Sequence, residues 1–265
     1  MTTIAIEPVR ECLTGAGQMP LSRVVGVELR KMFDTRAGFW LVASIGIAGL
    51  LATILTILFA PDGDLTYDTF ATAVGFPMTV ILPMIALLSI TGEWSQRTGL
   101  ATFTLVPNRR RVMAAKTISA VTVAIASMLF ALAIGALGNL LGSTIADTAL
   151  VWDVPPAQAA TIIVGNLIGL LTGTMLGMVI RNSAGALVAY FCYSLVLPTL
   201  AGFLAANQSW FRDLQPWVDL NYAQGALFVG SVSGEQWANL AVTATAWVLL
   251  PSAVGLALVM RSEVK

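Results

Sequence analysis

Residues 91–116 read TGEWSQRTGLATFTLVPNRRRVMAAK and form a polar segment between two long apolar runs. The segment opens near an acidic side chain, is broken by a proline and ends in a basic cluster. The apolar run on each side is long enough to cross a bilayer as a helix. The pattern therefore predicts a compact charged element, expected to be helical, held between two membrane spans.

The composition of the chain is that of a membrane protein. Hydrophobic residues make up 57% of the 265 residues and charged residues 11%, whereas charged residues form about 25% of an average soluble domain. A soluble domain of this length has no room to bury so much apolar surface, which indicates a polytopic membrane protein. Histidine is absent, which excludes His-dependent metal sites and the Ser/His and Cys/His nucleophile pairs.

Six apolar segments carry no Asp, Glu, Lys or Arg. They cover approximately residues 39–59, 70–90, 117–141, 157–180, 184–206 and 237–260. Each has the roughly 20 residues that a helix needs to cross about 30 Å of hydrocarbon. They lack the alternation of a β-barrel strand, so the predicted fold class is all-α with six transmembrane helices in a domain spanning residues 37–265.

The N-terminal region divides into a tail and a helix. Residues 1–20 predict a loose cytoplasmic tail, and residues 21–36 predict an amphipathic helix. One face of that helix is apolar: Leu21, Val24, Val25, Leu29 and Met32. Glu28 and Lys31 fall at the flanks of this face. The helix is expected either to lie along the inner membrane surface or to be an ordinary juxtamembrane basic segment.

Basic residues orient the chain. With the N-terminus inside and six spans, every one of the 14 Lys and Arg residues except Arg212 falls on the cytoplasmic side. The external loops are acidic instead. This distribution follows the positive-inside rule and predicts a multi-pass protein of a bacterial-type cell membrane with both termini in the cytoplasm.

Glycines in the fourth span recur at every fourth position. They are Gly165, Gly169, Gly173 and Gly177. Such a stripe lets another helix approach closely. Packing within one subunit is the favoured interpretation, and a dimer seam is the alternative.

Prolines and aromatics mark three other regions. The second span contains Pro77 and Pro83, and the fifth and sixth contain Pro198 and Pro251. Each is expected to kink its helix, for static packing or as a hinge. The external segment 207–236 is rich in aromatic residues, which favours short helices at the outer interface.

Several kinds of chemistry are missing from the sequence. It contains no G-x-x-x-x-G-K-[ST] phosphate loop, so the chain is not expected to be an enzyme or to hydrolyse nucleotide. The six apolar segments contain no ionisable Asp, Glu, Lys or Arg, which disfavours ion-coupled transport, a charged channel pore and an intramembrane aspartyl protease. Energy for any transport is expected to come from another protein.

The polar segment resembles the loop after the second span in ABC-2 type transporter permeases. The matching residues are Glu93, Thr98, Gly99, Thr102, Leu105, Pro107, Arg109, Arg111, Val112, Ala115 and Lys116. The stretch 27–36 is similar to the elbow helix of that family, and the C-terminus is similar too, so the resemblance covers essentially the whole chain. Two details depart from the family pattern: Thr98-Gly99 stands in place of Gly-Thr, and Ser95 in place of a common basic residue.

The resemblance implies a permease subunit of an exporter for a hydrophobic or amphipathic substrate, such as a drug, lipid, peptide or polymer. It implies two ATPase subunits and a second permease subunit as partners, in a homodimer or a heterodimer. ATP and Mg²⁺ would bind to the ATPase, and no cofactor would bind to this chain. Nucleic acid is not an expected partner.

The resemblance also assigns roles within the segment. A cytoplasmic coupling helix between the second and third spans would contact the ATPase through Glu93, Arg97, Thr98, Gly99, Thr102, Pro107 and Arg109. A second group of basic residues is expected at the inner membrane surface, near lipid headgroups: Arg30, Lys31, Arg36, Arg110, Arg111 and Lys116. The arginine cluster also serves as a topology signal.

Two other functions stay open at this point. An autonomous transporter or channel would conduct without an ATPase. A membrane scaffold or immunity protein would act by binding, without flux.

Overall fold

The structure, a computed structural model, describes residues 19–96, 102, 104, 106 and 108–261. It is 88% helical without strands in these residues. Six of the described helices are long and apolar enough to cross a membrane, which confirms the predicted fold class. The predicted tail of residues 1–20 lies almost wholly outside the described residues.

Each predicted span corresponds to one observed helical segment. The six segments are Gly38–Phe59, Tyr67–Ser95, Arg109–Ile145, Pro156–Ile180, Ser183–Asn207 and Gly234–Arg261. The first four lie within α2 (Arg36–Phe59), α3 (Tyr67–Ser95), α5 (Arg109–Ile145) and α6 (Pro156–Ile180). A short 3-10 turn, η2 (Asp62–Asp64), connects α2 to α3.

The third span begins earlier than its apolar run. Helix α5 has 37 residues, which at 1.5 Å per residue gives about 55 Å, well beyond the thickness of the hydrocarbon. The side chain of Asn108 caps its first turn by accepting a hydrogen bond from the backbone N–H of Arg111. The basic stretch at 109–116 is therefore continuous with the span and rigid with it.

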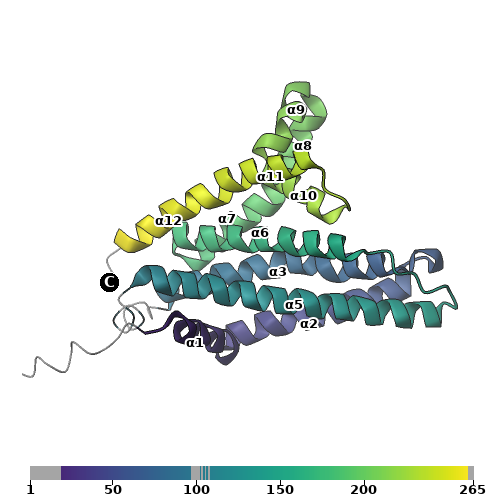
Figure 1. Ribbon diagram of the computed structural model, residues 1–265, viewed down its shortest axis with the longest axis horizontal. Helices are drawn as coiled ribbons and strands as arrows, with labels where there is room; N and C mark the ends of the chain where they lie inside the picture. The colour runs from purple at the N-terminus through teal and green to yellow at the C-terminus, as the bar shows by residue number, and fades with distance from the viewer. Residues whose placement is uncertain (1–18, 97–101, 103, 105, 107, 262–265) are drawn as a thin grey trace, which may run out of the picture.

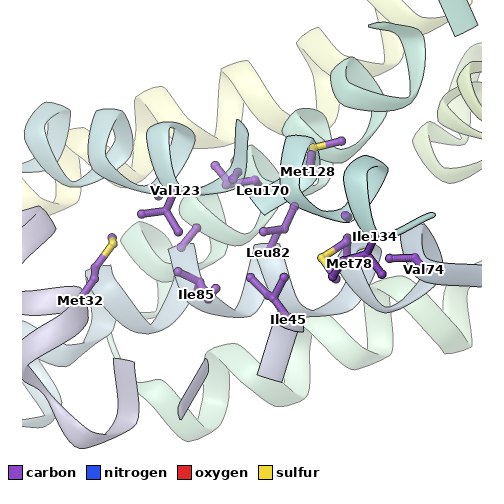
Figure 2. Packing of buried hydrophobic residues seen from close by; sticks show 14 residues of the cluster. Met32, Ile45, Val74, Met78, Leu82, Ile85, Val123, Met128, Ile134 and Leu170 are labelled. Carbon is purple, nitrogen blue, oxygen red and sulfur yellow. The ribbon is translucent and has the colours of Figure 1, made fainter. Parts of the chain in front are cut away.

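Helix α3 lies at the centre of the bundle, packed against α2, α5 and α6 (Figure 1). Its buried side chains form the main apolar core with residues of its neighbours, as Figure 2 shows. The labelled members of that core are Met32, Ile45, Val74, Met78, Leu82, Ile85, Val123, Met128, Ile134 and Leu170. Because one helix supplies so much of the core, a displacement of α3 is felt by all of its neighbours.

The glycine stripe of α6 packs within the chain. A Cβ at Gly173 would overlap the carbonyl oxygen of Pro83, and one at Gly177 would lie 3.0 Å from Ile90 Cβ. Both contacts are to α3, so two of the stripe's glycines allow the α3 and α6 backbones to approach closely. At Gly165, a Cβ would meet the ring of Phe228 instead. At these positions the stripe lies against other parts of the same chain.

The fifth and sixth spans are each interrupted by a π-turn. The fifth consists of α7 (Ser183–Phe191), η3 (Cys192–Val196) and α8 (Leu197–Asn207). The sixth consists of α11 (Gly234–Ala244), η5 (Thr245–Leu249) and α12 (Leu250–Arg261).

Each π-turn directly precedes a Leu-Pro pair. The backbone N–H of Leu197 donates to the carbonyl of Cys192, and the backbone N–H of Leu250 donates to the carbonyl of Thr245. Pro198 and Pro251 follow at once. A proline clashes with the carbonyl four residues earlier, and the wider turn removes that clash. The expected local disturbance at these two prolines thus takes the form of a widened turn.

Short helices fill the segment after the fifth span, as predicted. They are α9 (Ser209–Val218), α10 (Leu220–Gly225) and η4 (Ala226–Phe228), and in Figure 1 α9 lies at the far tip of α8. The guanidinium of Arg212 donates to the carbonyls of Ala205 and Ala206. Arg212, the basic residue that does not follow the predicted cytoplasmic placement of Lys and Arg, therefore caps the C-terminal end of α8.

Helix α1 (Leu21–Asp34) packs against α5 and α2. Val24 and Met32, on the predicted apolar face, are buried, whereas Arg23 and Arg30 are exposed. The face also contains a buried acid, Glu28, which the sequence placed only at its flank.

Candidate functional site

The last turn of α3 carries a buried acid, Glu93, whose side chain is 3% exposed. Its Oε1 lies 2.9 Å from Nζ of Lys116 in α5 and 3.3 Å from Nζ of Lys31 in α1. Its Oε2 accepts a hydrogen bond of 2.9 Å from the hydroxyl of Thr102. One carboxylate thus connects three helices and the polar segment between the second and third spans.

Glu28 of α1 is the second acid of the site. Its Oε2 lies 2.6 Å from Nζ of Lys116, and its Oε1 lies 2.8 Å from Nζ of Lys31. The four residues Glu28, Lys31, Glu93 and Lys116, here called the charge cluster, form a closed ring of ion pairs. Two negative and two positive charges make the cluster neutral, and every carboxylate oxygen has a partner.

The charge cluster tolerates burial because its charges are paired. Moving a single ion out of water costs several kcal/mol, and only close partners with good geometry offset that cost. Three of the four side chains are at most 5% exposed, whereas Lys31 is 42% exposed. Burial lowers the pKa of Lys31, but hydrogen bonds and attraction from Glu28 and Glu93 outweigh it, and the net pKa is raised.

A chain of hydroxyl groups joins the same turn of α3 to the fifth span. The Oγ of Ser183, in the first turn of α7, lies 2.8 Å from Thr91 Oγ1 and 2.8 Å from Ser95 Oγ. The backbone N–H of Ser183 also donates to Ser95 Oγ. The fifth span is therefore bonded to the end of α3 at the level of the charge cluster.

Arg109 connects the third span with the sixth. Its Nη1 donates a hydrogen bond of 2.9 Å to the carbonyl of Val259, near the C-terminal end of α12. A cation at this end of a helix is also favoured by the helix dipole. Polar contacts therefore join α5 to α12 here, while the charge cluster and the hydroxyl groups join α1, α3, α5 and α7.

The residues expected to contact an ATPase are only partly described. Arg97, Thr98, Gly99 and Pro107 lie outside the described residues. Glu93, Thr102 and Arg109 are described, and the structure brings Glu93 and Thr102 into direct contact. Arg109 donates a hydrogen bond to the carbonyl of Val259 in α12.

The residues expected at the inner lipid surface fall into two groups. Arg30, Arg36 and Arg110 are exposed, and Arg111 is partly so. Lys116 requires a correction because it is buried between Glu28 and Glu93, where its ammonium faces carboxylates and not lipid. Lys31 is half-exposed and paired with the same two acids.

Sequence reasoning missed the role of Glu28. The available signal was an acid next to the apolar face of a predicted amphipathic helix, which is costly unless a cation meets it there. Its partner Lys116 is 88 positions away. Only the packing of α1 on α5 identifies the pair.

Comparison with known proteins assigns no family. No family model matches the chain, and no curated protein matches its sequence significantly. The relation to ABC-2 permeases therefore stays a prediction from the residues themselves.

Proposed function

We propose that this chain is the membrane-spanning permease subunit of an ATP-driven ABC-2 type exporter. One observation carries the proposal: Thr102, in the segment between the second and third spans, bonds the buried carboxylate of Glu93. Through that carboxylate the segment is connected to α1, α3 and α5. A protein that pushes on this segment from the inner face acts on several spans at once.

The contacts suggest how such a push is transmitted. The segment displaces the hydroxyl of Thr102, and the carboxylate of Glu93 follows because a buried ion cannot leave its partners without a large cost. Lys116 and Lys31 then draw the ends of α5 and α1 with it. Ser183 and Arg109 extend the same displacement to the fifth and sixth spans.

Partners follow from the same proposal. Two ATPase subunits, which hold ATP and Mg²⁺, contact the segment from the cytoplasm of the cell, where both termini of this chain also lie. A second permease subunit covers the outlying spans. In support, only 11% of the most apolar stretch of the fifth span is buried within the chain, compared with 50% of the corresponding stretch of the fourth span.

The substrate class is hydrophobic or amphipathic. The six apolar runs contain no Asp, Glu, Lys or Arg, so a passing molecule would meet apolar, hydroxyl and amide groups there. Such a surface offers no counter-ion for a small charged solute.

Purification of the tagged chain at its native expression level tests the proposal. We expect a phosphate-loop ATPase to co-purify, and we expect Thr102→Val to lower ATP hydrolysis by the complex in nanodiscs while the ATPase stays bound. Thr122→Val is the matched control, because the Thr122 hydroxyl bonds only its own helix and is exposed. If liposomes containing this chain alone conduct without ATP, the protein is an autonomous channel and the proposal fails.

A further inference from the structure

A cavity of about 170 Å³ lies beside the charge cluster. It is bounded by α1, α2, α3, Lys116 of α5 and the first residue of α7. About 10–15 Å³ of such space is enough to hold one water molecule. The cavity therefore has room for a much larger guest, such as the polar group and first methylenes of an amphiphile.

The lining changes from polar to apolar along two helices at once. On α3 it runs from Gln96 and Ser89 to Leu88 and Ile85, and each step leads deeper into the span. On α2 it begins at the polar N-cap Thr35 and ends at Leu41 and Val42. A lipid of the adjacent leaflet has the same gradient, with a polar headgroup at the surface and acyl chains inside.

Lys31 gives the polar end of the cavity a cation. Its ammonium has three N–H donors, and two of them face Glu28 and Glu93. With 42% of its side chain exposed, the lysine has a donor left for a guest in the cavity. Glu28 also lines the cavity, but both of its oxygens already accept from lysines.

We infer that this cavity binds one phospholipid of the inner leaflet. The lipid's phosphate accepts a charge-assisted hydrogen bond from Lys31, and the start of an acyl chain lies against Leu41, Val42 and Leu88. The apolar wall favours a lipid over free phosphate, because a phosphate ion gains nothing from that wall. The inference rests on the placement of the spans in a membrane and not on any ATPase, so it stands or falls separately from the proposed transport function.

Gly92 is a position from which a side chain can be built into the cavity. It lines the cavity, and a Cβ built there meets nothing within 4 Å. Gly92→Leu therefore places a side chain in the space proposed for the lipid, and replacing a helical glycine favours the helix. Gly75→Leu is the matched control, since Gly75 lies on the same helix and its Cβ would also meet nothing within 4 Å.

The experiment is native mass spectrometry of the full, delipidated chain titrated with dioleoyl phosphatidylglycerol. We expect one tight lipid-binding event that weakens about tenfold or more in Gly92→Leu and in Lys31→Gln, and that is unchanged in Gly75→Leu. Dioleoylglycerol, which lacks the phosphate, and inorganic phosphate, which lacks the chains, should each bind at least about tenfold more weakly. Equal binding by Gly92→Leu and the unaltered chain would overturn the inference, and so would equal binding of either partial probe.

Discussion

Lys116 is the residue whose removal tests the charge cluster most strongly. In Lys116→Met the apolar stem is kept, but Glu28 and Glu93 lose partners at 2.6 and 2.9 Å. Lys31 would then be the one cation of the charge cluster left for two buried carboxylates. Breaking a buried ion pair on one side typically costs about 3–5 kcal/mol. For a chain of this size, each kcal/mol lowers the unfolding midpoint by roughly 2–4 °C, so the expected drop is on the order of 6–20 °C.

The assay is thermal unfolding of the purified chain in detergent, with a double variant and a control. Adding Glu28→Gln to Lys116→Met restores neutrality, with Lys31 facing Glu93, and should recover a substantial part of the lost midpoint. Arg110→Met serves as the control because Arg110 is exposed on the same helix, and it should change stability by less than about 0.5 kcal/mol. The reasoning is refuted if Lys116→Met unfolds at the same temperature as Arg110→Met, or if the double variant is no more stable than the single one.

Three further outcomes are expected. Gly173→Ala should lower the free energy of unfolding by about 1–3 kcal/mol, because the added methyl forces the α6 backbone away from Pro83. Gly75→Ala should leave that free energy unchanged or raise it, and equal unfolding midpoints of the two variants would contradict the close approach of α6 and α3. Arg212→Ala should speed amide hydrogen exchange in the last turn of α8, whose carbonyls it caps, and unchanged exchange would show that the cap contributes nothing. The pKa of Lys31 is raised above its ordinary 10.5, so the stability that charged Lys31 contributes is fully present below pH 10.5 and is lost as the pH rises through the raised pKa. The unfolding midpoints of the unaltered chain and Lys31→Gln should therefore differ by a constant amount up to about pH 10 and converge at higher pH. Convergence near neutral pH would contradict this.

The number of spans and their approximate positions follow from the sequence because both depend on local composition. A run of about 20 apolar residues has few alternatives to a membrane helix, and this holds for each of the six segments. Helix ends are different. Helix α5 starts at Arg109, ahead of its apolar run, because the Asn108 cap supplies an acceptor to the first turn outside the lipid, where water solvates the arginines.

The glycine stripe marks an intermediate case. The four-residue spacing predicted close approach of another helix, but the pattern names no partner. The structure identifies α3 as the partner, because Pro83 and Ile90 of α3 lie against Gly173 and Gly177.

The candidate site could be predicted only in part. Glu93 and Thr102 stood out within one polar segment, whereas Glu28 and Lys116 come together through contacts between distant helices. For Lys116 the sequence and the structure also indicate different locations. A lysine near the end of a span indicates the inner surface, yet Lys116 is buried because two acids meet it there.

Site-specific photo-crosslinking in living cells tests the central claim most directly. A benzoylphenylalanine placed at Thr104, an exposed position two residues from the Glu93 contact, should crosslink to a protein that carries a phosphate loop. The same probe at Val229, which is 86% exposed in the segment between the fifth and sixth spans, should not. If no phosphate-loop protein is captured at Thr104, or if Val229 captures it equally well, a separate ATPase does not drive this chain through its inner face.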